Sequence, residues 1–96
     1  MRGTAADRGL LSLRRAGLAW QELHGRVVVL TLGNDVLHEF NDTGSAVFRW
    51  LWQEARSRAQ LVDLLVDEFV VAPATARRDL EAFLADLAAL GIVEEA

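Results

Sequence analysis

Two histidines are the residues of this sequence best suited to catalysis or metal binding, and neither has suitable neighbours. His24 stands in a predicted two-residue turn, His24-Gly25, which favours a solvated side chain. His38 lies beside Glu39 and close to Asp35, so it could supply half of a metal site. Neighbouring residues on a strand point to opposite faces, however, and the sequence offers no second cluster of ligands. We therefore expect no metal ion.

The remaining carboxylates do not form a catalytic pattern either. They follow the spacing of helix surfaces that face solvent. These residues are Asp63, Asp67, Glu68, Asp79, Glu81 and Asp86. The chain has no cysteine, no glycine-rich phosphate loop, and no nucleophile paired with a base. The sequence predicts neither a catalytic site nor a cofactor, and an enzyme is the weakest functional hypothesis.

Composition narrows the class of protein. With 96 residues the chain can bury one core, and we expect a flexible arm over residues 1–9 and a single domain over residues 10–96. The net charge of −4 argues against general nucleic-acid binding, which relies on clustered positive charge. No apolar run reaches the ~18 residues of a membrane span, and the first residues lack the apolar segment of a signal peptide. We expect a cytoplasmic protein that binds neither membrane nor nucleic acid.

Strands dominate the first half of the chain. Residues 18–23, 26–32 and 36–40 have strand patterns, and the second of these segments is apolar on both faces and hence central. The short turns between them require an antiparallel meander, in which the third strand is an edge. Residues 10–15 fit either an extra strand or a packed lead-in.

A helix is expected immediately after the third strand, over about residues 43–55. Asn41, Asp42 and Thr43 are three candidates for its N-cap or first turn, because their side-chain oxygens accept free backbone N–H groups. Gly44 is expected on the inner face of this helix, where it would let the backbone approach the sheet.

Two more helices complete the chain. Ser57 is a suitable N-cap for the second helix, Pro73 fits the first turn of the third, and Gly91 suits its C-terminal end. Residues 92–93 should fold back onto the core, and residues 94–96 should fray. The predicted fold class is α+β and winged-helix-like: a three-stranded antiparallel sheet followed by a three-helix bundle.

The predicted edge strand, residues 36–40, suggests a binding surface. It carries one formal charge and no proline, whereas soluble proteins usually protect such an edge. The third helix has a small and apolar flank with two charged residues above it: Leu84, Ala85 and Ala88, with Arg77 and Glu81. If that flank faces the edge strand, the two form a groove that an extended peptide could enter by strand addition.

Arg77 and Arg78 support an alternative, a winged-helix DNA-binding transcriptional regulator. They stand near the start of the third helix, where a recognition helix would contact phosphates. Asp79 and Glu81 largely cancel their charge. The sheet also precedes the helices instead of forming a wing after the third one, so DNA binding ranks second.

The chain resembles the PqqD-like proteins, the stand-alone form of the RiPP recognition element, over roughly residues 10–93. The matching segments are residues 20–30, 40–48, 79–84 and 90–93. The family pattern Leu-Asn-x-x-Gly-x-x-Ile-Trp corresponds here to Phe40, Asn41, Gly44, Val47 and Phe48. A second pattern, Phe-Leu-x-x-Leu-x-x-x-Gly-Leu, corresponds to the end of the third helix. One departure is that many relatives have an aromatic residue just before the Leu-Asn pair, where this chain reads Leu37-His38-Glu39.

The resemblance implies a peptide-binding function. In this family the leader segment of a ribosomally made precursor joins the third strand and lies against the third helix. Carried over by position, the contacts are Val36, Leu37, His38, Glu39, Phe40, Arg77, Glu81, Leu84, Ala85 and Ala88. The resemblance also implies a separate modifying enzyme, such as a radical SAM enzyme in pyrroloquinoline quinone assembly, or a leader peptidase or cyclase in lasso peptide maturation. We expect a monomer or a weak dimer formed through the open edge.

Overall fold

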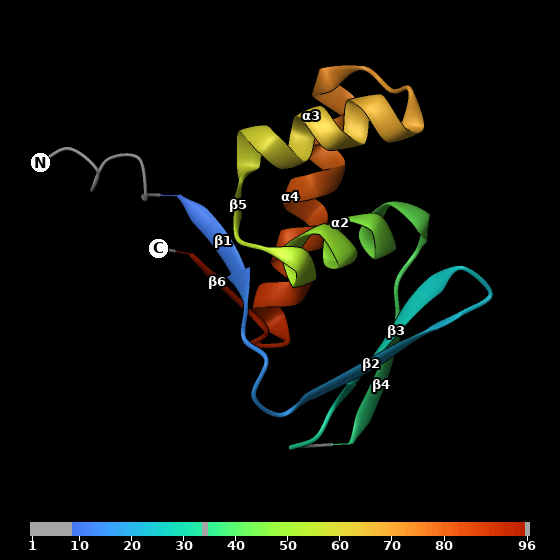
Figure 1. Ribbon diagram of the computed structural model, residues 1–96, viewed down its shortest axis with the longest axis vertical. Helices are drawn as coiled ribbons and strands as arrows, with labels where there is room; N and C mark the ends of the chain where they lie inside the picture. Colours follow the sequence, from blue (N-terminus) through green and yellow to red (C-terminus); the bar gives the residue numbers. More distant parts are fainter. Residues whose placement is uncertain (1–8, 34, 96) are drawn as a thin grey trace, which may run out of the picture.

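Two three-stranded antiparallel sheets and three helices make up residues 9–33 and 35–95, the part of the chain that the computed structural model describes (Figure 1). The elements run in the order β1 (Leu10–Leu13), β2 (Leu18–Leu23), β3 (Arg26–Thr31), β4 (Val36–Glu39), α2 (Asp42–Gln53), β5 (Arg56–Ser57), α3 (Arg58–Phe69), α4 (Pro73–Ala89) and β6 (Val93–Glu95). The α+β class is as predicted. The arm expected over residues 1–9 lies, except for Gly9, outside the described residues.

The first sheet is the predicted meander, with strand order β2-β3-β4. Trp20 on β2 pairs with Val29 on β3, which pairs with His38 on β4. His24 and Gly25 join β2 to β3 with φ angles of 56° and 82°, and two positive values are what a two-residue type I′ turn requires. Within the described residues, β4 has β3 on one side and no strand on the other, so it is an edge strand.

The second sheet, with order β5-β1-β6, resolves the ambiguity of residues 10–15 in favour of a strand. Leu11 on β1 lies between Arg56 on β5 and Glu95 on β6. Figure 1 shows β1 (blue) and β6 (dark red) side by side. The expectation that Glu94 and Glu95 fray is therefore wrong. Their pairing joins the two ends of the chain, and a contact over such a sequence separation leaves no local pattern.

The helix boundaries follow the predicted capping residues. Asn41 caps α2, because its side-chain oxygen accepts the N–H of Gly44 at 2.8 Å. Ser57 begins α3 in a capping box with Gln60. Pro73 occupies the first turn of α4, where its missing N–H costs nothing.

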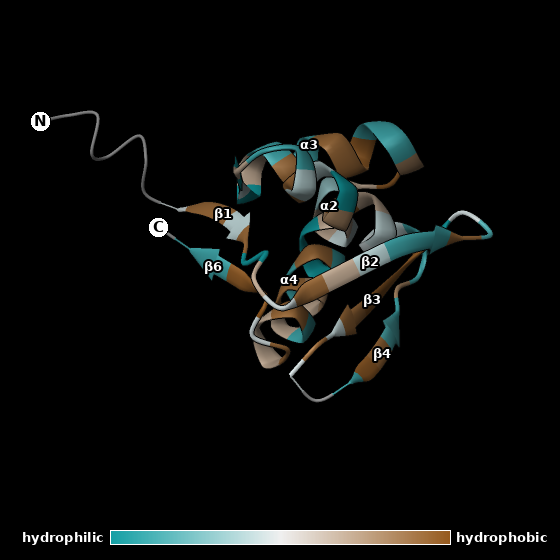
Figure 2. Cartoon of the chain, turned by 60° about the horizontal axis from the view of Figure 1, so that its bottom comes forward, coloured by the Kyte–Doolittle hydropathy of each residue, from teal (hydrophilic) through white to brown (hydrophobic). Residues whose placement is uncertain are grey.

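The core lies between the first sheet and the helices, which cover one side of it (Figure 2). Val27 and Val29 on β3 are completely buried, as are Val47 and Phe48 on α2. Leu87 of α4 belongs to the same cluster. This packing fixes β3, and with it β4, relative to α4. None of the helices in the described part of the chain combines the length and the hydropathy that a membrane span requires.

Candidate functional site

The outer edge of β4 presents backbone hydrogen-bonding groups to solvent. The N–H of Phe40 donates to the carbonyl of Val27 at 3.0 Å, so these two residues form a hydrogen-bonded pair of the ladder. Hydrogen-bonded pairs alternate along an antiparallel ladder. His38 therefore bonds inward to its partner Val29, whereas Leu37 and Glu39 direct their N–H and C=O groups to the open edge. Two donors and two acceptors are available there for an added strand.

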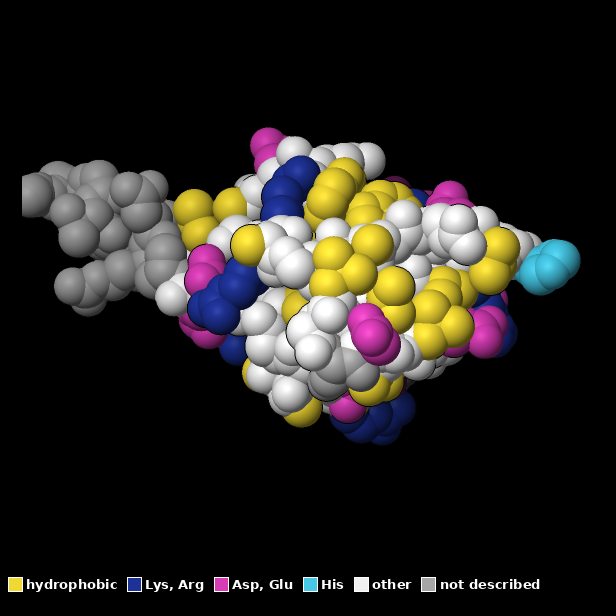
Figure 3. All heavy atoms as spheres, turned by 90° about the horizontal axis from the view of Figure 1, so that it is seen from below, with side chains coloured by type: hydrophobic (Ala, Val, Ile, Leu, Met, Phe, Trp, Pro, Cys, Tyr) yellow, Lys and Arg dark blue, Asp and Glu magenta, His cyan; other side chains and the backbone are white. Residues whose placement is uncertain are grey.

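The side chains of β4 alternate between the two faces of the sheet. His38 follows Trp20 and Val29 on the inner face, toward the helices, and its buried Nε2 atom has no hydrogen-bond partner among the described residues. Leu37 points to the outer face, where 67% of its surface is exposed beside a shallow hollow that includes Leu30. Seen from below, hydrophobic side chains gather on part of the surface, with acidic ones scattered among them (Figure 3).

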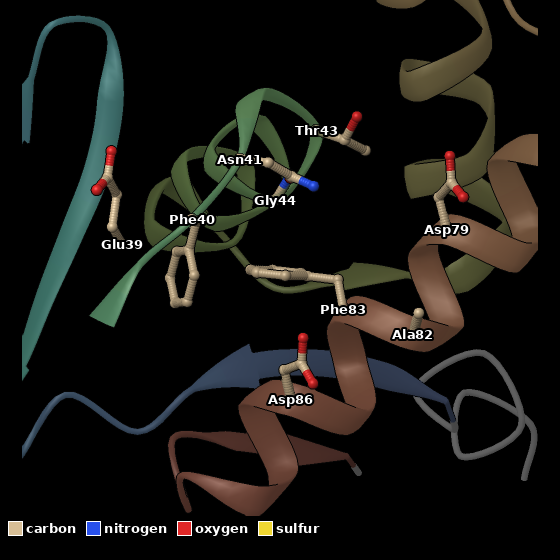
Figure 4. A pocket seen from close by; sticks show the side chains of 9 residues that line it. All are labelled: Glu39, Phe40, Asn41, Thr43, Gly44, Asp79, Ala82, Phe83 and Asp86. Atoms are coloured by element: carbon tan, nitrogen blue, oxygen red, sulfur yellow. The ribbon is translucent and has the colours of Figure 1, made fainter. Parts of the chain in front are cut away.

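A cavity of about 420 Å³ lies where β4 ends, between this end, the start of α2 and one face of α4. Phe40 and Phe83 form its apolar part: their rings meet edge to face, with centroids 4.9 Å apart and an interplanar angle of 89°. Ala82 lines the α4 wall. Figure 4 shows the two rings side by side, one from the strand end and one from α4. We call this cavity, together with the open edge of β4, the β4–α4 groove.

Gly44 lies under the Phe83 ring. A Cβ atom built on Gly44 would come within 2.7 Å of Cε1 of Phe83 and 3.2 Å of Oδ1 of Asn41. The expectation that Gly44 lets the helix approach the sheet is wrong, because the atoms closest to Gly44 belong to Phe83 of α4 and not to a strand. The missing side chain makes room for Phe83 of α4, so this glycine shapes the groove.

Three carboxylates surround the apolar part of the groove: Glu39 at the strand end, and Asp79 and Asp86 on α4 (Figure 4). Arg26 approaches Glu39 at 4.0 Å but is closer to Asp42, at 3.2 Å, outside the cavity lining. Exposed ion pairs at such distances contribute little. Asp86 has no ion pair within the described part of the chain.

The predicted helix contacts lie elsewhere. Glu81, Leu84, Ala85 and Ala88 line a different cavity, of about 300 Å³, beside β6. Arg77 and Glu81 line a third one beside α3. The structure brings Val36 to Phe40 together, but it does not place these five α4 residues opposite β4. That these five residues contact a peptide stays a prediction. Its premise, that their flank of α4 faces the edge strand, does not hold.

These five residues do not face β4 because of the way α4 is rotated about its own axis. Ala76, Leu80 and Leu87 form the buried stripe of α4, and a helix has a flank on each side of such a stripe. The flank chosen from the sequence is the one beside β6. The flank that faces β4 contains Asp79, Ala82, Phe83 and Asp86.

The sequence contains a signal for the flank that lines the cavity between β4 and α4. Asp79, Ala82, Phe83 and Asp86 have the i, i+3, i+4, i+7 spacing of one helix face. Their spacing alone predicts a solvated face for the two aspartates, because no local pattern says which side of α4 meets the strand. Within the described residues, no three His, Asp or Glu side chains are placed to hold a metal ion. The groove is suited to holding an extended chain.

Comparisons with known proteins agree on the fold. The family model of coenzyme PQQ synthesis protein D (PqqD) matches residues 26–93. The solved structure of TbiB1 in complex with the TbiA(beta) leader peptide superposes with a TM-score of 0.77 at 24% identity, over 86% of this chain and 94% of that one. Lasso peptide synthetase B1 complexed with the leader peptide gives 0.75 at 23% identity, over 88% and 96%. No curated protein sequence matches this chain.

Proposed function

The chain belongs to the PqqD family, as its motifs indicated, and we propose that it binds the leader segment of a ribosomally synthesised precursor peptide by strand addition to β4. The open edge of β4 beside the β4–α4 groove is the observation that carries this proposal. The two solved structures compared above each contain a bound leader peptide, which supports it.

Strand addition uses backbone groups that are already in place. A leader segment beside β4 would pair with the N–H and C=O groups of Leu37 and Glu39, which the β3 ladder leaves free. Alternate side chains of the added strand would then point toward α4, where Phe40, Ala82 and Phe83 offer apolar contact. Backbone pairing would supply affinity, and the groove would supply selectivity.

We further propose that the protein presents the bound leader to a separate modifying enzyme in the cytoplasm and does no chemistry itself. The described residues hold no metal-binding cluster, and the groove pairs no nucleophile with a base. The enzyme would be of the radical SAM, leader peptidase or cyclase class. Binding a substrate through its leader leaves the rest of the precursor free for that enzyme.

A proline at position 37 tests strand addition. Leu37→Pro removes one edge donor but leaves the β3–β4 ladder intact, and proline is tolerated on edge strands. The control Leu37→Ala removes the side chain and keeps the donor. His38→Pro is unsuitable, because the N–H of His38 lies on the β3 side and its loss would weaken the sheet.

The assay is calorimetric titration with the leader segment of a candidate precursor peptide, to be sought among the short open reading frames next to the gene. We expect Leu37→Pro to weaken binding by about tenfold or more, the effect of losing ~1.4 kcal/mol. Leu37→Ala should bind within about twofold of the unchanged protein. Equal affinity of all three proteins would refute strand addition at β4.

DNA binding finds no support in the geometry. Arg77 lies on the α3 side of α4, and Arg78 pairs with Asp79 at 3.8 Å. The two arginines therefore do not form one basic surface. A gel shift at low salt should show no retarded duplex.

A further inference from the structure

We propose that the β4–α4 groove selects a leader segment that carries a lysine or arginine two residues from a large apolar side chain. This inference rests on the proposed function, because it names the chemistry of the peptide held at that site. The site itself is defined by the open strand edge and by the Phe40–Phe83 pair. The carboxylates around it determine which side chains fit.

The spacing of α4 matches that of an added strand. Asp79 and Asp86 are seven residues apart, which is about 10 Å along a helix, with Ala82 and Phe83 midway between them. Side chains on one face of a strand recur about every 7 Å. An apolar residue packed against Ala82 and Phe83 would therefore place the next inward side chain near one of the two aspartates. A long basic side chain spans the remaining distance.

The charges near the groove favour a cation. Glu39, Asp79 and Asp86 line it, and none of the arginines in the described part of the chain does. Arg78, which approaches Asp79, has 76% of its side chain exposed, so solvent screens that pair.

Besides Arg26 and Arg78, whose exposed side chains approach Glu39 and Asp79, the N-terminus of α2 also favours an anion near the groove. The side chain and the carbonyl of Asn41 already accept the N–H groups of Gly44 and Ser45. Asp42 adds a carboxylate in the first helical turn, which opposes the positive end of the helix dipole. A basic side chain of the peptide would thus meet a net negative surface, and an acidic one would be repelled.

The experiment selects peptides from a displayed library of random dodecapeptides. The targets are the unchanged protein, the double variant Asp79→Asn with Asp86→Asn, and the control Asp67→Asn, an exposed carboxylate on α3 outside the groove. With the unchanged protein and the control, we expect selected sequences to carry lysine or arginine two positions from a large apolar residue. With the double variant, that basic position should lose its enrichment.

One selected peptide is then synthesised with its basic residue and with glutamine in its place. The unchanged protein should bind the glutamine version about fivefold more weakly, the upper range for one partly exposed ion pair. This difference should shrink in high salt and vanish in the double variant. Circular dichroism verifies that the double variant is folded, and the salt series on the unchanged protein does not depend on that variant.

The outcomes separate the two proposals. If selected peptides bind, and Leu37→Pro weakens them, but no basic position is enriched, the charge inference is overturned and strand addition stands. The charge inference also fails if the double variant selects the same basic residue. If no peptide is selected at all, both proposals fail.

Discussion

The side-chain oxygen of Ser45 accepts a hydrogen bond from the backbone N–H of Val27 at 2.8 Å. The same hydroxyl donates to the carbonyl of Phe40 at 3.3 Å. Val27 and Phe40 are opposite each other at the end of the β3–β4 ladder, so the serine takes the place of one direct backbone bond between them. This completely buried hydroxyl ties α2 to the strand end that borders the groove.

Ser45→Ala should destabilise the fold. The substitution leaves the N–H of Val27, a completely buried residue, without its partner, and an unpaired buried donor costs about 1–3 kcal/mol. Urea unfolding measures the loss. Thr43→Ala, in the same helical turn, changes a side chain that lies at the groove surface, and should shift the free energy of unfolding by less than about 0.5 kcal/mol. Equal stability of the two variants would contradict the assigned role of the hydroxyl.

Gly44→Ala should weaken peptide binding more than it weakens folding. The new Cβ would lie 2.7 Å from the Phe83 ring, which borders the groove and must shift into it. Overpacking costs about 1–3 kcal/mol, and the better helix propensity of alanine returns about 1 kcal/mol. Gly33→Ala, where a Cβ meets no atom within 4 Å, is the control. In calorimetry, we expect Gly44→Ala to lose leader affinity and Gly33→Ala to keep it.

Leucine substitutions on the two flanks of α4 distinguish the observed groove from the contacts predicted by position. Ala82→Leu fills the groove and should lower leader affinity by about tenfold, which corresponds to ~1.4 kcal/mol. Ala85→Leu places the same bulk beside β6 and should leave affinity unchanged. If Ala85→Leu lowers leader affinity and Ala82→Leu does not, the peptide contacts the flank that includes Leu84 and Ala88. Both alanines are exposed, so both variants should fold.

Arg58 should contribute to stability in a salt-dependent way and not to peptide binding. It bonds Glu81 of α4 at 2.7 Å and Glu95 of β6 at 2.8 Å. These hydrogen bonds, the one to Glu81 first, raise the pKa of Arg58. A raised pKa means that the stabilisation is complete below the ordinary pKa of arginine and is lost only as pH rises above it. The contribution of the Arg58 charge should therefore be constant across neutral pH.

The corresponding variant is Arg58→Gln. Because the three side chains are partly exposed, we expect a loss of no more than about 1 kcal/mol, which decreases further in high salt. Urea unfolding at two salt concentrations measures it. Leader affinity should stay the same, since Arg58 lines the cavities beside β6 and α3 and not the β4–α4 groove.

Self-association should compete with peptide binding if two copies pair through β4. Antiparallel pairing of one β4 with another satisfies the same edge groups and brings two exposed Leu37 side chains into proximity. Sedimentation equilibrium should then show a weak dimer that leader peptide dissociates and that Leu37→Pro abolishes. A dimer that persists in the presence of saturating peptide would place the contact elsewhere.

The sequence by itself determined the three-stranded meander, the three helices and the order in which they follow one another. The turn at His24-Gly25, the cap at Asn41 and the first-turn Pro73 act through neighbouring residues, so their effects can be predicted locally. The meander and its edge strand followed from turn length alone, since short turns leave one antiparallel pairing. The family motifs could be recognised because they too are patterns of residues close together in the sequence.

The tertiary structure decided which surfaces meet. The pairing of β1 with β6 joins residues about 80 positions apart, and no local pattern encodes it. The side of α4 that faces β4 depends on how the helix is rotated about its axis, which only core packing sets. If the flank beside β6 faced β4, Ala85 and Ala88 would make the groove apolar. The flank that does face β4 carries Asp79 and Asp86, which make the groove acidic. The edge strand could be read from the sequence, but the chemistry opposite it could not.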